Sequence, residues 1–274
     1  MKMNMTLRSI LATTGIALLS LFSLLPFYIM IIMGTHVNED LFRKIVLLPG
    51  SYLIENFKTV AASRFDLAYW NSFVVSAAST VLSVFVSAFA GFAFAKYDFK
   101  HKNLIFSAIL LTMMIPSQLG IVAYVIEMRY LGLSGTLMPL ILPWIANAFG
   151  VFWMTQFIKG AVPNEVLESA RIDGCSDLGL FFRIVPAFIM PAVTTLSLLV
   201  FLWSWNNYLL PLIIINNPDL YTIPLSITTL GDAYRTDLAA QILGLSIGTL
   251  PVLMLFAFGS KSFIRGLTAG SVKG

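Results

Sequence analysis

Six long stretches of this chain contain no charged residue, and they restrict the possible folds more than any other feature. The stretches are residues 10–33, 71–95, 103–126, 130–158, 184–218 and 238–260. Each can hold a helix of about 20 residues, the length that crosses the hydrocarbon core of a bilayer. The sequence therefore predicts an all-α integral membrane protein with six transmembrane helices, near 10–33, 71–95, 104–126, 137–159, 187–212 and 239–260.

Composition agrees with a membrane protein. Hydrophobic residues make up 58% of the chain and charged residues only 11%, whereas soluble domains carry about 25% charged residues. The first apolar stretch is too long for a cleaved signal peptide, and no small-residue cleavage site follows it. We therefore expect it to be a permanent span, and residues 1–274 to form a single transmembrane domain.

The distribution of Lys and Arg predicts the orientation. If the N-terminus lies inside, the inner segments hold 11 of the 17 Lys and Arg residues, and four of the others lie in one long outer loop, 34–70. Cytoplasmic loops of membrane proteins carry an excess of these residues. Both termini are therefore expected in the cytoplasm, together with a loop at about 160–185 and a tail at 261–274.

The sequence argues against nucleic-acid binding, a metal site and a disulfide. The net charge of +4 comes from basic residues that are scattered along inner loops and form no continuous face. The two histidines, His36 and His101, fall on opposite sides of the membrane in this topology. Cys175 is the only cysteine, so no intrachain disulfide can form.

Residues 244–248 match the Gly-x-Ser-x-Gly pattern of hydrolase nucleophile elbows. That motif requires a strand–turn–helix context and a histidine partner, whereas here it falls in an expected membrane helix with no histidine nearby. Gly244 and Gly248 also form a Gly-x-x-x-Gly pattern, which lets membrane helices pack closely. We favour the packing interpretation, with a membrane hydrolase as the weakest alternative.

A polar segment between the fourth and fifth stretches predicts a helical hairpin. Its first helix begins near Pro163, which suits a first turn, and ends at Gly174 in a left-handed cap. A charged face and an apolar stripe recur along this helix: Glu165, Glu168 and Arg171, and Val166, Leu167 and Ala170. Ser176 and Asp177 can cap a second helix, which carries Leu178, Phe181 and Phe182.

The hairpin could dock on a protein or lie on lipid headgroups. Helices that lie on lipid favour Lys and Arg on their polar face, but this segment carries four acids and one base between Glu165 and Asp177. Anionic lipid would repel it, so docking on a soluble partner is favoured. An amphipathic helix of this kind can seat in a partner's groove.

The residues of the hairpin carry a resemblance to a known family. Glu168-Ser169-Ala170-x-x-Asp173-Gly174, with Ile184 ten residues later, resembles the Glu-Ala-Ala loop of the carbohydrate-uptake permeases of bacterial ABC importers, on the side of the smaller permease of the maltose transporter. Further segments match in order along the chain: Asn71-Ser72, 95–99, Met114-Ile-Pro116, 131–133, Trp205-Asn206-Asn207, Thr222-Ile-Pro224 and 266–274. The sequence departs from the family's pattern at two positions. Ser169 stands where the family has an alanine, and the proline of the motif, Pro186, comes one residue early.

The resemblance implies a type I ABC importer permease fold and a mechanism. Two related permeases would pair around a translocation path in the bacterial cytoplasmic membrane, above two ATPase subunits. An extracytoplasmic binding protein would deliver a sugar or oligosaccharide. This chain would be a transporter subunit and not an enzyme, with no cofactor of its own, and ATP and Mg would lie on the partner ATPase. The coupling residues would be Glu168, Ser169, Ala170, Asp173 and Gly174.

Polar and aromatic residues inside the apolar stretches are candidates for the sugar path. Polar groups within a membrane are costly and often functional, and an indole ring can stack on a sugar. Amides also bond between helices, and Trp also prefers the membrane interface, so a purely structural role stays open. The candidates are Gln118, Asn147, Trp203, Trp205, Asn206 and Asn207.

Two further segments have expected contacts. The tail with Gly266, Gly270 and Lys273 is expected to reach the ATPase pair, because the family's tail is similar, although a frayed terminus is the alternative. It lacks Gly-Lys-Ser/Thr and is no phosphate loop. The outer loop 216–237 is expected either to reach the binding protein or to be a plain connector.

A secondary sugar transporter is the alternative function. Such proteins show internal repeats, interrupted helices and coupling ions near the midplane. No convincing repeat is present, and no acid lies within an expected span.

Overall fold

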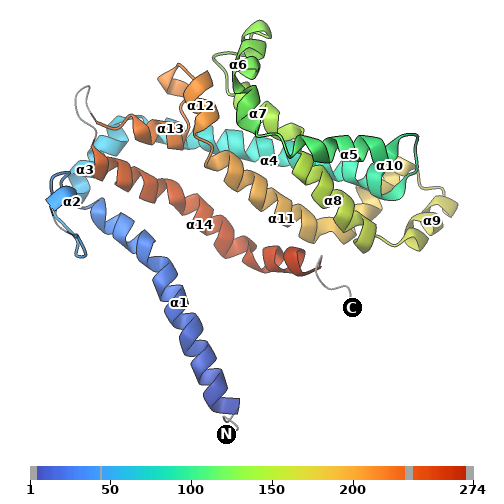
Figure 1. The fold of residues 1–274 in the computed structure, drawn as a ribbon, viewed down its shortest axis with the longest axis horizontal. Coiled ribbons are helices and arrows are strands. Elements are labelled where there is room, and N and C mark those ends of the chain that lie inside the picture. Colours follow the sequence, from blue (N-terminus) through green and yellow to red (C-terminus); the bar gives the residue numbers. More distant parts are fainter. Residues whose placement is uncertain (1–4, 44, 232–236, 270–274) are drawn as a thin grey trace. The chain divides into compact units, whose positions relative to one another are not determined.

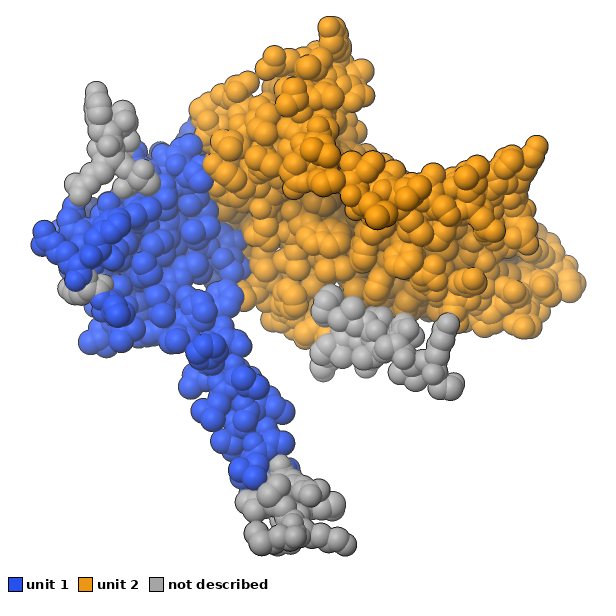
Figure 2. Space-filling view, in the orientation of Figure 1, with its two compact units in different colours: residues 1–65, 226–250 blue, residues 66–225, 251–274 orange. Residues whose placement is uncertain are grey.

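The computed structural model describes residues 5–43, 45–231 and 237–269, and for 5–8, 258 and 261–269 only the backbone. In these ranges the regular elements are helices. The chain divides into two compact units, residues 1–65 with 226–250 and residues 66–225 with 251–274 (Figure 2). The fold class predicted from the apolar stretches is confirmed.

Five helical segments are long and apolar enough to cross a membrane. They are Ser9–Met33, Phe65–Lys96, Met138–Ala161, Asp177–Trp205 and Leu238–Ala257. A sixth span is formed by Lys102–Thr112 together with Ser117–Tyr130, if this pair is counted as one. The two members of the pair are bent by 87°.

The bend corrects the prediction of one straight helix over 104–126. Helix α5 (Lys102–Thr112) ends before Pro116, and the short helix η1 (Ser117–Gly120) leads into α6 (Ile121–Tyr130). Proline has no N–H for a helical hydrogen bond, and it pushes the preceding residue out of the helical region. Helix α6 also extends past the predicted end, so that Glu127 lies within it.

The fourth and fifth spans are interrupted by asparagines. Helix α7 (Met138–Ile145) is followed by α8 (Ala148–Ala161), where the Asn147 side chain accepts a hydrogen bond from the Gly150 N–H. The predicted helix 187–212 is wrong at its end. Helix α11 (Val185–Trp205) stops, and α12 (Leu209–Ile214) restarts after the Asn207 side chain, which accepts from the Leu210 N–H at 3.3 Å.

The second unit has its main core between α4 (Phe65–Lys96), α8 and α11, which run side by side (Figure 1). Met154, Ile158 and Leu196 are fully buried there. A Cβ added at Gly91 would lie 2.6 Å from the Met154 Cβ. Small residues thus let α4 and α8 approach closely, as they do between membrane helices generally.

The first unit joins α1 (Met5–Met33), the short helices α2 (Asp40–Arg43) and α3 (Leu53–Ala62), and the first part of α14 (Leu238–Ala269). The buried Asn56 amide donates to the carbonyls of Gly34 and His36, each at 2.8 Å. Helix α14 continues nine residues beyond the predicted end at 260, so the start of the expected tail is helical.

Candidate coupling helix and translocation site

Helix α9 (Asn164–Ile172) is the first helix of the predicted hairpin, and it lies beyond the ends of α8 and α11 (Figure 1). Pro163 occupies the N-cap position with extended backbone angles, one residue before the first turn. Glu165, Glu168 and Ser169 are exposed to solvent. The side chain of Ser169 donates to the Glu165 carbonyl at 2.8 Å within the same helix.

Gly174 ends α9 in the left-handed conformation that the sequence predicts. Its φ is +84°, a value that L side chains rarely adopt. The Gly174 N–H bonds to the Arg171 carbonyl at 3.0 Å, and the Cys175 N–H to the Ala170 carbonyl at 2.9 Å. This pair of bonds is the Schellman arrangement, which satisfies the last carbonyls of a helix. Asp173 is exposed just before the turn.

The second helix of the hairpin is the beginning of the fifth span. The Ser176 side chain caps it by accepting from the Gly179 N–H at 3.2 Å. Helix α10 (Asp177–Gly179) and the π-helical turn η2 (Leu180–Ile184) then pass directly into α11. Only a turn of a few residues therefore separates α9 from the helical segment that continues into α11.

The end of α4 holds both ends of α9. Near the start of α9, the Lys96 ammonium donates to the Val162 carbonyl and to the Asn164 side chain. Near its end, the Tyr97 hydroxyl donates to the Asp177 carboxylate at 2.8 Å. The residues that form these contacts are distant in sequence, and we call this arrangement the α4 clamp.

Arg171 completes the clamp at the C-terminal end of α9. Its guanidinium donates to the Asp177 carboxylate at 3.2 Å and lies 5.4 Å from the centroid of the Tyr97 ring. Burial raises the pKa of the Tyr97 phenol above its ordinary value, and the hydrogen bond to Asp177 raises it further. The phenol therefore stays protonated at neutral pH and acts as a donor.

The apolar stripe of α9 faces the protein's own core instead of a partner, and a different apolar residue, Ile172, is exposed. Leu167 is only 3% exposed and belongs to the core of its own unit, with Ala170 packed against that core. Leu167 thus holds α9 to the protein and is not available to a partner. Ile172 is instead 87% exposed, and Val166 is partly exposed. In the sequence, the only indication that Ile172 would be exposed is its position outside the apolar stripe of Val166, Leu167 and Ala170.

Two of the predicted path residues meet in one cavity. Gln118 and Asn207 line a hollow of about 570 Å³ within the second unit, at the bend between α5 and α6. Sequence reasoning missed three other members of its lining, Tyr124, Glu127 and Trp144. Only the bend, which the apolar pattern does not reveal, brings these residues together.

The other predicted path residues lie outside this cavity lining. The Asn147 amide caps α8 and also donates to the Ser83 hydroxyl at 3.4 Å. The Asn206 amide donates to the Leu202 carbonyl of its own helix at 2.9 Å. Trp205 is only 3% exposed, whereas Trp203 is 40% exposed and packs on Phe149.

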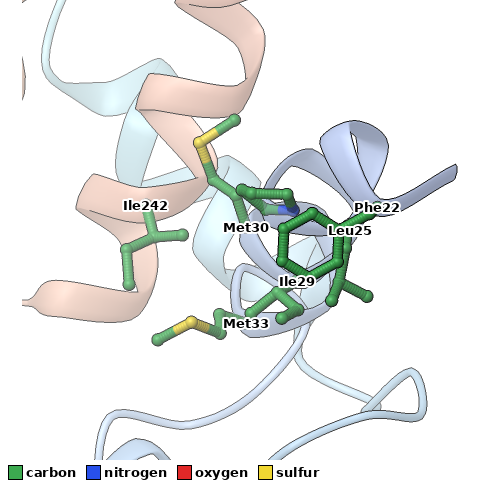
Figure 3. Close-up of a pocket in the computed structure, with 7 residues that line it drawn as sticks. Phe22, Leu25, Ile29, Met30, Met33 and Ile242 are labelled. Carbon is green, nitrogen blue, oxygen red and sulfur yellow. The ribbon is translucent and has the colours of Figure 1, made fainter. Parts of the chain in front are cut away.

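A second hollow, in the first unit, has a different character. It encloses about 400 Å³ between α1 and Ile242 of α14 (Figure 3). Its described lining consists of apolar side chains and one proline: Phe22, Leu25, Pro26, Ile29, Met30, Met33 and Ile242. Such a surface offers no hydrogen bond to a sugar, so it is no candidate for the path.

The motifs Asn71-Ser72 and Thr222-Ile-Pro224 bind each other in the structure. The Asn71 amide donates to the carbonyls of Asp219 and Tyr221 at 2.8 and 3.1 Å. The Ser72 hydroxyl accepts from the Ile223 N–H at 2.8 Å. The part of the predicted outer loop from η3 (Pro218–Leu220) to the first residue of α13 (Ile223–Thr228) is therefore bonded to α4.

Two remaining predictions concern the ends of the outer loop and of the chain. Residues 232–236 of the outer loop lie outside the described residues, and so do Gly270 and Lys273 of the tail. Gly266 lies in the last part of α14.

The hydrolase-like pattern has a structural explanation. Ser246 lies inside α14, and its hydroxyl donates to the Ile242 carbonyl at 2.9 Å. A Cβ added at Gly244 would lie 3.3 Å from the Ile227 side chain. The segment thus serves helix packing, and it is not the strand–turn–helix that a nucleophile elbow requires.

Comparisons with known proteins agree along most of the chain. Residues 83–267 match the family described as binding-protein-dependent transport system inner membrane component. The chain is 33% identical over 262 residues to the arabinooligosaccharides transport system permease protein AraQ of Bacillus subtilis (strain 168), covering 94% of this chain and 93% of that protein. It is 32% identical over 259 residues to the lactose transport system permease protein LacG of Rhizobium radiobacter, covering 94% of each.

A solved structure shares the fold. It is a bacterial ABC transporter involved in the import of the acidic polysaccharide alginate, with a TM-score of 0.76 and 18% sequence identity over 96% of this chain and 100% of that one. These matches confirm the resemblance seen in the motifs, and they exclude the secondary transporter and the hydrolase as the class of this protein.

Proposed function

Since this chain belongs to the family of binding-protein-dependent transport system inner membrane components, we propose that it is one of two permease subunits in an ATP-driven importer of sugars or oligosaccharides. The observation that carries the proposal is the near full-length similarity to permeases named for arabinooligosaccharides and lactose. The chain would form half of the translocation path, and the complete importer would lie in a bacterial cytoplasmic membrane.

Membership of the family supports the proposed partners. A second related permease pairs with this chain, two ATPase subunits bind ATP and Mg on the cytoplasmic side, and an extracytoplasmic binding protein supplies the sugar. Both termini and α9 face the cytoplasm in this arrangement, in line with the excess of Lys and Arg in the inner segments. In this proposal the chain itself needs no cofactor.

Helix α9 is the coupling element in this proposal. Its exposed face offers Glu165, Glu168 and Ile172 to a groove of the ATPase. Closure of the ATPase pair would displace α9, and two connections would carry the displacement into the spans. One is the short turn through Gly174 into α11, and the other is the α4 clamp at Lys96 and Tyr97.

Reconstitution of the complete transporter tests the proposal. The two permeases and the ATPases are placed in liposomes with the binding protein, and uptake of labelled arabinotriose and lactose is measured with ATP or with a non-hydrolysable analogue. We expect ATP-dependent accumulation of at least one of these saccharides. Equal uptake with and without hydrolysis, or uptake of neither saccharide, would contradict the function.

A further inference from the structure

The cavity at the bend between α5 and α6 has the size and position of a ligand site. Its volume of about 570 Å³ falls in the range of about 300 to 1,000 Å³ that small-molecule pockets occupy. It is lined by residues from η1, α6, α7, the segment before α12 and the start of α12, all in the second unit. Non-helical backbone at membrane depth is tolerated where it is buried in protein or lines a water-filled cavity.

Polar groups in the cavity lining are available to a ligand. Within the described residues, the side chains of Gln118 and Glu127 form no hydrogen bond or ion pair, and the Trp144 indole N–H has no acceptor. Asn207 uses its side-chain oxygen for the Leu210 N–H and keeps its NH₂ group free in the same part of the chain. The lining therefore combines amide donors and acceptors, one carboxylate and one aromatic ring.

Glu127 is the most informative member of this lining. It lies in α6, which belongs to the bent pair of apolar helices that together are long enough to cross a membrane. Ionisable residues in such segments are costly, and they usually face a water-filled path and mark where a substrate passes. The Glu127 carboxylate has no protein partner among the described residues of this cavity, so a ligand that donates hydrogen bonds would suit it.

We propose that this cavity is a saccharide-binding subsite on this chain, and that Glu127 makes it selective for neutral over acidic saccharides. The inference rests on the proposed function and adds the position of the sugar and its charge class. Glu127 accepts from two sugar hydroxyls, Gln118 and Asn207 bond to further hydroxyls, and the Trp144 ring stacks on the apolar face of a sugar ring.

The selectivity follows from the sign of the charge. Hydrogen bonds to an ionised group are roughly twice as strong as those between neutral groups, so the carboxylate favours hydroxyl-rich neutral sugars. The carboxylate of a uronate sugar would be held close to Glu127 with no basic side chain in the cavity lining to compensate. Specific sites reject competitors by such unpaired or repelling charges.

Direct binding to the complete transporter tests the subsite. The transporter, with two permeases and two ATPases in lipid nanodiscs and without its binding protein, is titrated with labelled lactose, arabinotriose and digalacturonate. We expect the wild-type complex to bind at least one neutral probe more tightly than digalacturonate. Glu127→Gln keeps the size but removes the charge, and it should weaken neutral binding about ten-fold or more, as expected for a lost hydrogen bond to a charged group.

The ratio of the two affinities separates a binding role from a structural one. In Glu127→Gln the preference for neutral over acidic saccharide should shrink or disappear, whereas a general disturbance would weaken both probes alike. Asn207→Ala and Trp144→Leu should weaken the neutral probe as well. Glu55→Gln, which changes an exposed acid paired with Lys58 on α3, is the matched control and should bind like the wild type.

The outcomes distinguish this inference from the proposed function. If the transporter imports saccharides but Glu127→Gln binds all probes like the wild type, the subsite assignment is overturned and the function stands. The subsite assignment is also overturned if the importing wild-type complex binds no neutral probe, or binds digalacturonate as tightly as the neutral probes. If the wild-type complex imports no saccharide in liposomes, the proposed function itself fails.

Discussion

At the scale of single residues, two side-chain positions determine how α9 is held. Gly174 allows the tight turn, because its φ of +84° is open to glycine and strained for nearly every other residue. Tyr97 fixes the far side of the turn through its hydrogen bond to Asp177 and its contact with Arg171. Gly174 and Tyr97 thus determine how α9 is positioned, and neither contributes to the exposed face of α9.

Replacing Gly174 tests the turn. A leucine at φ +84° is strained by roughly 1–2 kcal/mol, so Gly174→Leu should displace α9 and lower ATP-driven uptake at least about ten-fold. Gly174→Asn should keep most of the activity, because asparagine tolerates the left-handed region. Uptake into liposomes and the amount of inserted permease are measured together.

The control for this change is another glycine in the same region. Gly160 has no atom within 4 Å of an added Cβ and no positive φ, so Gly160→Leu should transport normally. Normal uptake by Gly174→Leu would show that α9 does not need its turn for coupling.

Replacing Tyr97 tests the clamp. Tyr97→Phe keeps the ring beneath Arg171 but removes the donor to Asp177. We expect a severalfold lower ratio of saccharide transported to ATP hydrolysed, because α9 would follow the ATPase without pulling on α4. The control is Tyr52→Phe, which changes an exposed tyrosine in the first unit. An unchanged ratio in Tyr97→Phe would remove the clamp from the coupling route.

At the scale of elements, α4 connects two segments that are distant in the sequence. It has 32 residues, which corresponds to a length of about 48 Å at 1.5 Å per residue. Lys96 at its C-terminal end and Tyr97 directly after it hold α9, and Asn71 and Ser72 near its other end hold residues 219–223. A helix fixed at both ends is a direct physical connection between α9 and residues 219–223.

Replacing Asn71 tests the outer attachment. Asn71→Ala leaves the Asp219 and Tyr221 carbonyls without their donor, which should cost about 1–3 kcal/mol because these groups are partly buried. We expect a lower thermal unfolding midpoint of the purified transporter and reduced uptake. Asn103→Ala, at an exposed position of α5, should change neither quantity. An unaltered midpoint in Asn71→Ala would mean that the outer segment is held by other contacts.

At the scale of the whole molecule, the chain forms two compact units with α14 contributing to both. The cavity, the α4 clamp and α9 all belong to the unit of residues 66–225 and 251–274. The proposed coupling helix and the proposed saccharide subsite therefore belong to the same unit. The other unit presents a long apolar helix, α1, whose side chains at Phe22 and Leu19 are strongly exposed, as in a lipid or protein environment.

Truncation tests the C-terminal end. Ending the chain after Arg265 removes the last residues of α14 together with Gly270 and Lys273. If this end contacts the ATPase pair, the truncated transporter should insert normally but lose much of its saccharide-stimulated ATP hydrolysis or its ATPase subunits. Removal of Gly274 alone is the control. Full hydrolysis and assembly after truncation would leave the end as a simple terminus.

The sequence by itself determined the membrane class, the family and the local form of the hairpin. These properties depend on short-range patterns, namely apolar length, a capping serine and a glycine at a left-handed position. Gly174 and Ser176 could be assigned for this reason, because each role is set by neighbours within a few residues along the chain.

Only the tertiary structure decided which residues meet across distant segments. The bend before Pro116 moves Glu127 and Gln118 to the same cavity as Trp144 and Asn207, and Leu167 turns inward because the core of its unit covers it. Tyr97 and Asp177 are separated by 80 residues. A periodic pattern records which face of a helix is apolar, but what covers that face depends on how the helices pack. For this reason the hairpin could be predicted from the sequence and the cavity could not.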